Sequence, residues 1–154
     1  MAEPIPESIQ HALQAVTGRY YRLILLVGEI GSGKTAVLRD VAAHCGTSVI
    51  NVNLALSHAL LELTAKQRSL RLLEILDQIT DSASSPVVLD NLEILFDPEL
   101  KQDPLRLLQS ISRNQTVVAA WSGTLSSGKL SYAEIGHPEY RMYDSVDAII
   151  VEIN

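Results

Sequence analysis

The residues from Leu26 to Val37, LVGEIGSGKTAV, have the types and the spacing of a loop that holds phosphate groups. They fit the pattern G-x-x-x-x-G-K-[ST], in which glycines let successive backbone N–H groups point at phosphate oxygens. Lys34 supplies a point charge for the β- and γ-phosphates, and the hydroxyl of Thr35 is a ligand for Mg²⁺. We therefore expect ATP (or ADP) to contact Gly28, Glu29, Ile30, Gly31, Ser32, Gly33, Lys34, Thr35 and Ala36.

A second acid is needed to hold the magnesium ion and its water shell. The apolar run VVLD ends in Asp90. A carboxylate that ends a buried parallel strand faces the carboxyl edge of the sheet, where ligands bind in open α/β folds. The sequence therefore predicts Thr35 and Asp90 as the metal ligands.

The residue that activates the attacking water is left open at this point. Many ATPases of this kind carry Glu directly after the strand-ending Asp, whereas Asn91 follows Asp90 here. An amide can hydrogen-bond a water, but it cannot accept its proton. Glu93 is the alternative base, with a solvated surface glutamate as the competing interpretation. The predicted catalytic set is Lys34, Asp90, Asn91 and Glu93, and Ser122, after a later apolar run, is the candidate contact for the γ-phosphate.

Two arginines and one histidine are further candidates for functional residues. Arg113 and Arg141 are expected near the phosphate-loop edge, where either could act in trans on a neighbour's nucleotide. An ordinary surface arginine is the competing interpretation for both. His137 is expected to cap a short helix rather than bind metal, because no second His or Cys stands at ligand spacing.

Five apolar or β-branched runs are predicted to form strands. The first is YRLILLV, which lacks polar alternation and is therefore typical of a strand buried on both faces of a parallel sheet. The five runs are residues 21–27, 47–53, 86–90, 116–121 and 148–153.

Helical patterns lie between these runs. Residues 7–16 are predicted to form a short amphipathic helix, and a second helix is expected from Lys34 to about Cys45, with Gly46 as its C-terminal stop. Ser57 is expected to cap a further helix, TAKQ (64–67) is a capping box, and the segment DSASSP ends the helix that follows it. Asp103 and Pro104 are the cap and first residue of another helix.

The alternation of strands and helices predicts an α/β fold in a single domain, 1–154. Together with the loop, it indicates the P-loop NTPase fold. We expect a mainly parallel five-stranded sheet with helices on both faces and no helical lid domain.

Composition favours a cytoplasmic protein. The net charge of −6 disfavours a surface for nucleic acid, and no apolar run is long enough to span a membrane. One cysteine, Cys45, allows no internal disulfide, and the N-terminal residues lack the pattern of a signal peptide.

The pieces together are similar to the additional-strand class of P-loop ATPases, near the AAA+ group. More narrowly, the chain resembles the BrxF family of type III BREX phage-exclusion systems. That resemblance rests on the segments GEIGSGKT, LDNLEILFDPEL, DPLRLLQSISRN, AAWSG and GHPEYRMY. It implies a bacterial antiviral-defence component that binds ATP and works with a larger ATPase, a DNA methyltransferase and a phosphatase-like protein.

Three functions remain open from the sequence. The first is hydrolysis of ATP to ADP and phosphate, slow or stimulated by partners. The second is a nucleotide-binding switch or assembly subunit without turnover, which Asn91 favours. The third is a small-molecule kinase, although NVNLALS (51–57) offers only Asn51 and Asn53 as acceptor-binding groups.

Overall fold

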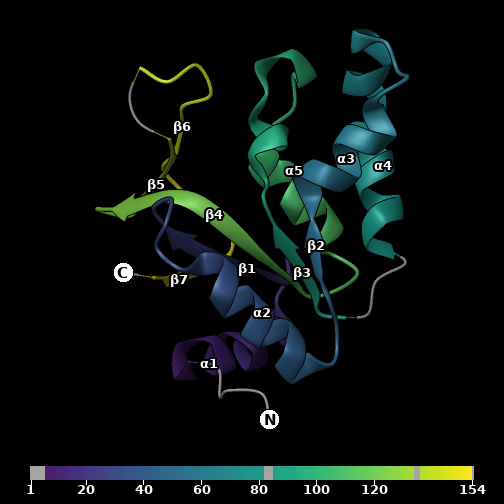
Figure 1. The fold of residues 1–154 in the computed structure, drawn as a ribbon. Coiled ribbons are helices and arrows are strands. Elements are labelled where there is room, and N and C mark those ends of the chain that lie inside the picture. The colour runs from purple at the N-terminus through teal and green to yellow at the C-terminus, as the bar shows by residue number, and fades with distance from the viewer. Residues whose placement is uncertain (1–5, 82–84, 134–135, 154) are drawn as a thin grey trace.

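A computed structural model of the chain describes residues 6–81, 85–133 and 136–153. A central sheet lies between helices (Figure 1). Five parallel strands follow the order β2-β3-β4-β1-β7, so β4 lies between the first strand and the third. The strands are β1 (Leu23–Gly28), β2 (Val49–Asn51), β3 (Val87–Asp90), β4 (Val117–Ser126), β5 (Lys129–Tyr132), β6 (Arg141–Tyr143) and β7 (Ile149–Glu152).

The helices alternate with the parallel strands, as the sequence predicts. No helix in the described part of the chain is long and apolar enough to cross a membrane. The α-helices are α1 (Glu7–Ala15), α2 (Lys34–Cys45), α3 (Val52–Leu60), α4 (Ala65–Asp81) and α5 (Pro104–Ile111). Three short 3₁₀ helices are η1 (Val16–Gly18), η2 (Glu93–Phe96) and η3 (Pro98–Leu100).

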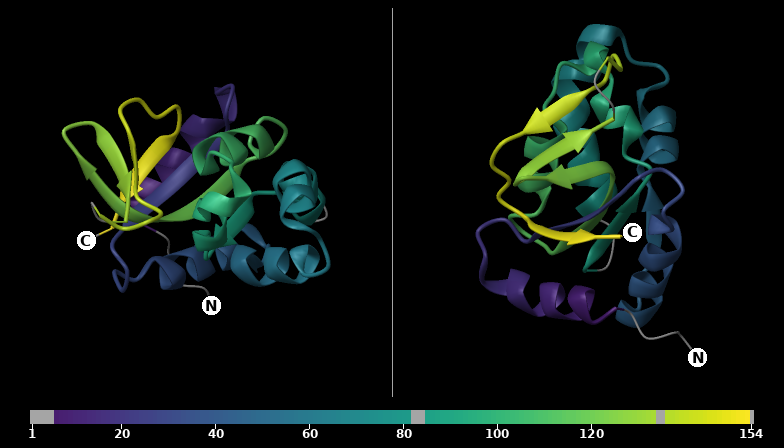
Figure 2. Two further views of the ribbon diagram at one scale, coloured as in Figure 1. Left: turned by 90° about the horizontal axis from the view of Figure 1, so that it is seen from above. Right: turned by 90° about the vertical axis from the view of Figure 1, so that its left-hand side faces the viewer.

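Helices cover both faces of the sheet, which explains the unbroken apolar run of β1. Ile24 and Leu26 pack with α1 and α2, whereas Leu23, Leu25 and Val27 pack with α3, α4 and α5. All five side chains are at most 1% exposed. Since neighbouring residues of a strand point to opposite faces, a strand buried on both sides must be apolar at every position. Figure 2 shows the two helical layers from two further directions.

Two antiparallel strands extend the predicted five-stranded sheet. β4 continues past residue 121 to Ser126 and turns back through Ser127 (φ 52°) and Gly128 (φ 77°) into β5, which pairs with β6. Positive φ at both central residues is typical of a tight two-residue hairpin. These strands stand on one side of the molecule, with α3 and α4 on the other (Figures 1 and 2). We call β5 and β6 the hairpin extension.

One of the predicted helix caps is wrong. Ser57 lies inside α3, which begins five residues earlier, and Asn51 is its N-cap, accepting a hydrogen bond from the Leu54 N–H at 3.0 Å. An Asn in extended conformation caps a helix as well as Ser does, so β2 passes into α3 without a loop.

Two other predicted caps are confirmed. Thr64 and Gln67 form a reciprocal capping box, with distances of 2.9 and 3.2 Å. Asp103 caps α5, which begins at Pro104. Of the helix-ending segment DSASSP, residues 82–84 lie outside the described part of the chain, as do residues 1–5 at the N-terminus.

Candidate nucleotide site

The loop between β1 and α2 has the backbone of a phosphate cradle. Gly31 (φ 85°) and Gly33 (φ 98°) adopt left-handed conformations that side chains disfavour. A Cβ at Gly28 would clash with the Ser32 hydroxyl. Gly33 is the N-cap of α2 and carries no side chain, so the first N–H groups of the helix are left for a ligand. An anion in the loop would meet these N–H groups.

Lys34 is turned back into the loop. Its side chain is 8% exposed, and its Nζ donates to the carbonyl oxygens of Gly28 (2.8 Å) and Glu29 (2.7 Å). Burial lowers the pKa of Lys34, and the charges of Asp90 and Glu93 oppose that effect. The ammonium group is thus held among loop carbonyls, inside the cradle that phosphates would enter.

Thr35 and Asp90 meet across the site. The Thr35 hydroxyl donates to Oδ2 of Asp90 at 2.8 Å, although 55 residues separate them in the chain. Asp90 ends β3 and is 6% exposed. A hydroxyl and a carboxylate are the oxygen ligands that Mg²⁺ prefers beside nucleotide phosphates. The donor set therefore fits the metal that the sequence predicts.

The backbone conformation of Asn91 explains why an asparagine follows Asp90. Its φ is 57°, and its backbone N–H donates to Oδ1 of Asp90 at 2.9 Å. Asn adopts this left-handed conformation more readily than other residues with side chains, apart from Asp. The amide at this position is therefore compatible with a bent backbone that orients the Asp90 carboxylate.

Glu93 lies at the start of η2 and is held by a neighbour. Its Oε2 accepts a hydrogen bond from Nδ2 of Asn53 at 2.9 Å. The Oδ1 of Asn53 in turn accepts the backbone N–H of Ile94 at 2.8 Å. Glu93 is thus a partly buried, anchored carboxylate and not a solvated surface group.

Ser122 lies beside the loop because β4 is adjacent to β1. It pairs in register with Gly28. It also lines a small cavity of about 10 Å³ together with Asp90, Asn91, Glu93 and Tyr132. That volume admits about one water molecule. The structure therefore brings the predicted catalytic carboxylates and Ser122 to one polar cavity.

Comparison with known proteins identifies the family. Residues 24–119 match the ATPase family associated with various cellular activities (AAA). The chain belongs to the AAA family. This AAA domain is a nucleotide-binding, ATPase-like domain. No curated protein matches the sequence.

Two solved structures resemble the AAA chain. One is the replication initiator DnaA bound to AMPPCP and single-stranded DNA, with a TM-score of 0.52, 17% identity, and coverage of 96% of this chain and 44% of that chain. The other is C. elegans PCH-2, with a TM-score of 0.45, 20% identity, and coverage of 96% and 39%. At such identity the DnaA likeness shows the fold alone. The AAA chain spans less than half the length of either structure.

The expected position of Arg113 is wrong. It precedes β4, at the amino edge of the sheet, whereas the phosphate loop follows the carboxyl end of β1. Its guanidinium lies 4.6 Å from the ring centre of Tyr20, and its carbonyl accepts a hydrogen bond from Arg22. Parallel strands place their starts and their ends at opposite edges, so a residue before β4 cannot lie beside a loop that follows β1.

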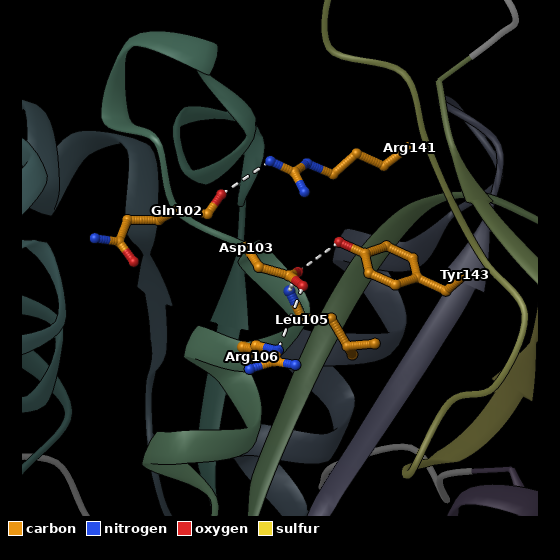
Figure 3. A network of polar contacts seen from close by, with 6 residues as sticks. All are labelled: Gln102, Asp103, Leu105, Arg106, Arg141 and Tyr143. Carbon is orange, nitrogen blue, oxygen red and sulfur yellow. Dashed lines mark hydrogen bonds and ion pairs between the residues drawn. The ribbon is translucent and has the colours of Figure 1, made fainter.

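Arg141 is engaged within the AAA chain. It lies on β6 and donates to the carbonyl oxygen of Gln102 at 3.0 Å (Figure 3). Nearby, the Tyr143 hydroxyl donates to the Asp103 carboxylate at 2.7 Å. The two bonds attach the hairpin extension to the segment that begins α5. In this structure Arg141 therefore stabilises the hairpin position.

His137 does not take part in a metal site in the described ranges. Its Nδ1 accepts the backbone N–H of Glu139 at 3.0 Å in a turn, not a helix. Within residues 6–81, 85–133 and 136–153, no three His, Cys, Asp or Glu side chains gather as a ligand group. The predicted short helix is not formed, so the capping prediction is wrong, and His137 accepts its hydrogen bond within a turn.

Sequence reasoning missed two residues of this site. Asn53 is the last residue of the predicted strand 47–53, and a polar residue at that position is a signal for the carboxyl edge of the sheet. Tyr132 gave no such signal, because its strand is short and its turn, SSGK, was not interpreted as a hairpin. Only the pairing of β4 with β5 brings Tyr132 to the cavity.

Proposed function

We propose that the chain binds Mg-ATP or Mg-ADP and hydrolyses ATP slowly. The single observation that carries this proposal is the 2.8 Å hydrogen bond between Thr35 and Asp90 beside the loop that buries Lys34. It joins the two predicted metal ligands, which stand far apart in the sequence. Bound magnesium would neutralise charge on the β- and γ-phosphates.

Each residue has a role in this proposal. Gly28 to Ala36 cradle the phosphates through backbone N–H groups, and Lys34 contributes positive charge. Thr35 and Asp90 hold the metal, Ser122 contacts the γ-phosphate, and Glu93 accepts the proton of the attacking water. Asn91 positions Asp90 through its backbone.

The anchoring of Glu93 is the reason to expect slow turnover. The hydrogen bond from Asn53 is stronger to the carboxylate than to the neutral acid, so it opposes the transfer of a proton to Glu93. A switch without turnover is the second candidate, because Glu93 would then remain bound to Asn53. The kinase has less support, since Asn51 caps α3 and Asn53 holds Glu93.

Calorimetry with Mg-ATP and Mg-ADP tests the binding step. Lys34→Ala should abolish binding while the fold survives, because the loop then lacks its cation. Lys66→Ala, which removes an exposed cation of α4, should bind as the parent does. Binding that persists unchanged in Lys34→Ala would contradict the assignment. Phosphate release without an added acceptor then separates hydrolysis from a silent switch and from a kinase.

We further propose a role in a bacterial BREX defence system, with the larger ATPase, methyltransferase and phosphatase-like protein as partners. The segments quoted above support it. Nucleotide-dependent self-association with an arginine acting in trans is part of this proposal. In a head-to-tail assembly the donating surface lies away from its own loop. Arg113, exposed at the amino edge, fits that requirement better than Arg141, which is bonded within the chain.

Pull-down with these partners, and sedimentation with ADP, with an ATP analogue and without nucleotide, test the assembly. We expect association in the ATP-analogue state that weakens in Arg113→Ala. A chain that stays monomeric in every state and binds none of the partners would contradict the proposal.

A further inference from the structure

The hairpin extension brings an aromatic hydroxyl to the proposed hydrolytic site. Tyr132 ends β5 and pairs with Gly123, the residue after Ser122. Its side chain lines the same small cavity as Glu93 and Ser122. It therefore adds a polar group to the place where a single water fits, and it comes from a strand outside the five-stranded parallel sheet.

The ring of Tyr132 is held firmly. It stacks on Phe96 with ring centres 3.5 Å apart and an interplanar angle of 9°, and Trp121 meets it edge-on. Phe96 belongs to η2, the same short helix that begins with Glu93. The indole of Trp121 donates to the carbonyl of Ser131 at 3.0 Å, which joins β4 to β5. Contacts from η2 and β4 thus fix the direction of the phenol.

The free end of this side chain is its hydroxyl. Tyr132 is 6% exposed, and among the described residues its hydroxyl has no hydrogen-bond partner. No fully buried polar side-chain atom of those residues lacks a partner, so the hydroxyl must keep access to solvent. Tyr132 lines the cavity together with Glu93, whose charge acts on the phenol. Burial, and then the charge of Glu93, raise the pKa of Tyr132, so the phenol stays protonated at neutral pH.

We propose that the Tyr132 hydroxyl hydrogen-bonds the attacking water in this cavity and holds it between Glu93 and Ser122. The proposal rests on the hydrolysis proposed above. In that step the water oxygen bonds to the γ-phosphorus while the bond to the departing ADP oxygen breaks, and Glu93 takes the proton of the water. Tyr132 keeps its own proton throughout and contributes orientation only.

The test compares two tyrosine-to-phenylalanine variants. Tyr132→Phe removes the hydroxyl from the cavity and keeps the ring that stacks on Phe96. Tyr143→Phe is the matched control, because Tyr143 is another aromatic residue of the hairpin extension, meets Trp121 edge-on at 5.8 Å, and bonds Asp103 instead. Each protein is titrated with Mg-ADP and with Mg-ADP plus aluminium fluoride, which imitates the transferring phosphoryl group with its water. Steady-state phosphate release and thermal unfolding complete the set.

We expect Tyr132→Phe to keep its affinity for Mg-ADP and to lose about fivefold in affinity for the aluminium fluoride complex, as for one lost hydrogen bond. Its kcat should fall by about the same factor with KM unchanged. Tyr143→Phe should unfold at a lower temperature and keep the parent's affinities and kcat.

The outcomes separate the two proposals. A Tyr132→Phe variant with the parent's kcat and aluminium fluoride affinity would overturn the role of Tyr132 and leave the nucleotide site intact. Equal losses of kcat and aluminium fluoride affinity in both variants would mean that the hairpin extension acts only as a structural support. That result would also overturn the role of Tyr132. A parent protein that binds Mg-ADP but neither hydrolyses ATP nor binds the aluminium fluoride complex would end the water-holding role while nucleotide binding stands. A parent that binds no Mg-ADP would end both proposals.

Discussion

Replacing Asn53 by alanine separates a structural bond from a catalytic restraint. The Asn53 amide makes two side-chain hydrogen bonds, one to the Glu93 carboxylate at 2.9 Å and one from the Ile94 N–H at 2.8 Å. Asn53→Ala removes both and leaves the carboxylate free to turn toward the cavity. Its backbone N–H still donates to the Asn91 carbonyl, so the chain path should persist.

The expected magnitudes follow from these bonds. A bond to a charged group contributes about 1.5 kcal/mol or more, and a neutral one about 1 kcal/mol, so the free energy of unfolding should fall by about 2 to 3 kcal/mol. Proton uptake by Glu93 weakens this bond, because a hydrogen bond to a carboxylate is stronger than one to the neutral acid. Removing a restraint of about 1.5 kcal/mol should raise the rate of phosphate release by up to about tenfold.

Two measurements and one control variant test whether Asn53 restrains Glu93. Urea denaturation gives the stability, and phosphate release at saturating Mg-ATP gives kcat. Asn51→Ala is the matched control, because it removes a neighbouring amide that caps α3 and does not touch Glu93. It should lose about 1 kcal/mol of stability and keep the parent's kcat.

The double variant Asn53→Ala/Glu93→Gln should lose the gain in rate, because an amide cannot take the proton. If Asn53→Ala is destabilised and its kcat stays level or falls, the bond serves only to anchor η2. The idea that this bond slows turnover would then be refuted.

Three further outcomes are expected. Leu76→Ala, at a fully buried position of α4, should lower the free energy of unfolding by about 3 kcal/mol in urea denaturation, whereas Leu70→Ala, 74% exposed on the same helix, should change it little. Asn91→Ala should lose about 1 kcal/mol in the same assay because φ is 57°, and Asn91→Gly should retain most of the stability; equal losses would mean that the amide itself is required. Burial and the bond to Asp103 raise the pKa of Tyr143 above its ordinary 10.0. Its contribution to the free energy of unfolding is therefore complete below pH 10.0 and declines as the pH rises beyond that value. When the pH is raised above 10.0, the free energy of unfolding should fall less in Tyr143→Phe than in the parent.

Local sequence patterns were sufficient to predict the parallel strands and the helices between them. The unbroken apolar run of β1, the glycines of the loop, the capping box at Thr64 and the Asp103-Pro104 pair each specify a local structure through neighbours in the sequence. The family match at residues 24–119 and the five-stranded parallel order agree with the predicted fold. Such features are predictable because propensity, capping and periodicity act over a few residues.

Residues that depend on distant pairing could not be placed in this way. Arg113 precedes β4, whereas Ser122 lies within it beside Gly28 at the end of β1, so the two residues are near opposite edges of the parallel sheet. The structure, and not the sequence, also showed that the left-handed backbone at Asn91 accommodates an amide after Asp90, and that Asn53 anchors Glu93.

The sequence by itself determined the residue types of the phosphate loop, its position between a buried strand and a helix, and the acid that ends the strand opposite it. Only the tertiary structure decided what surrounds that chemistry: the hydrogen bond that restrains Glu93, the hairpin that brings Tyr132 to the cavity, and the attachment of that hairpin through Arg141 and Tyr143. The physical reason is the separation along the sequence of the groups that form each feature. A loop that binds phosphate uses consecutive backbone groups, whereas a cavity for one water is enclosed by side chains from η2, β4 and β5, which meet only when the sheet has formed.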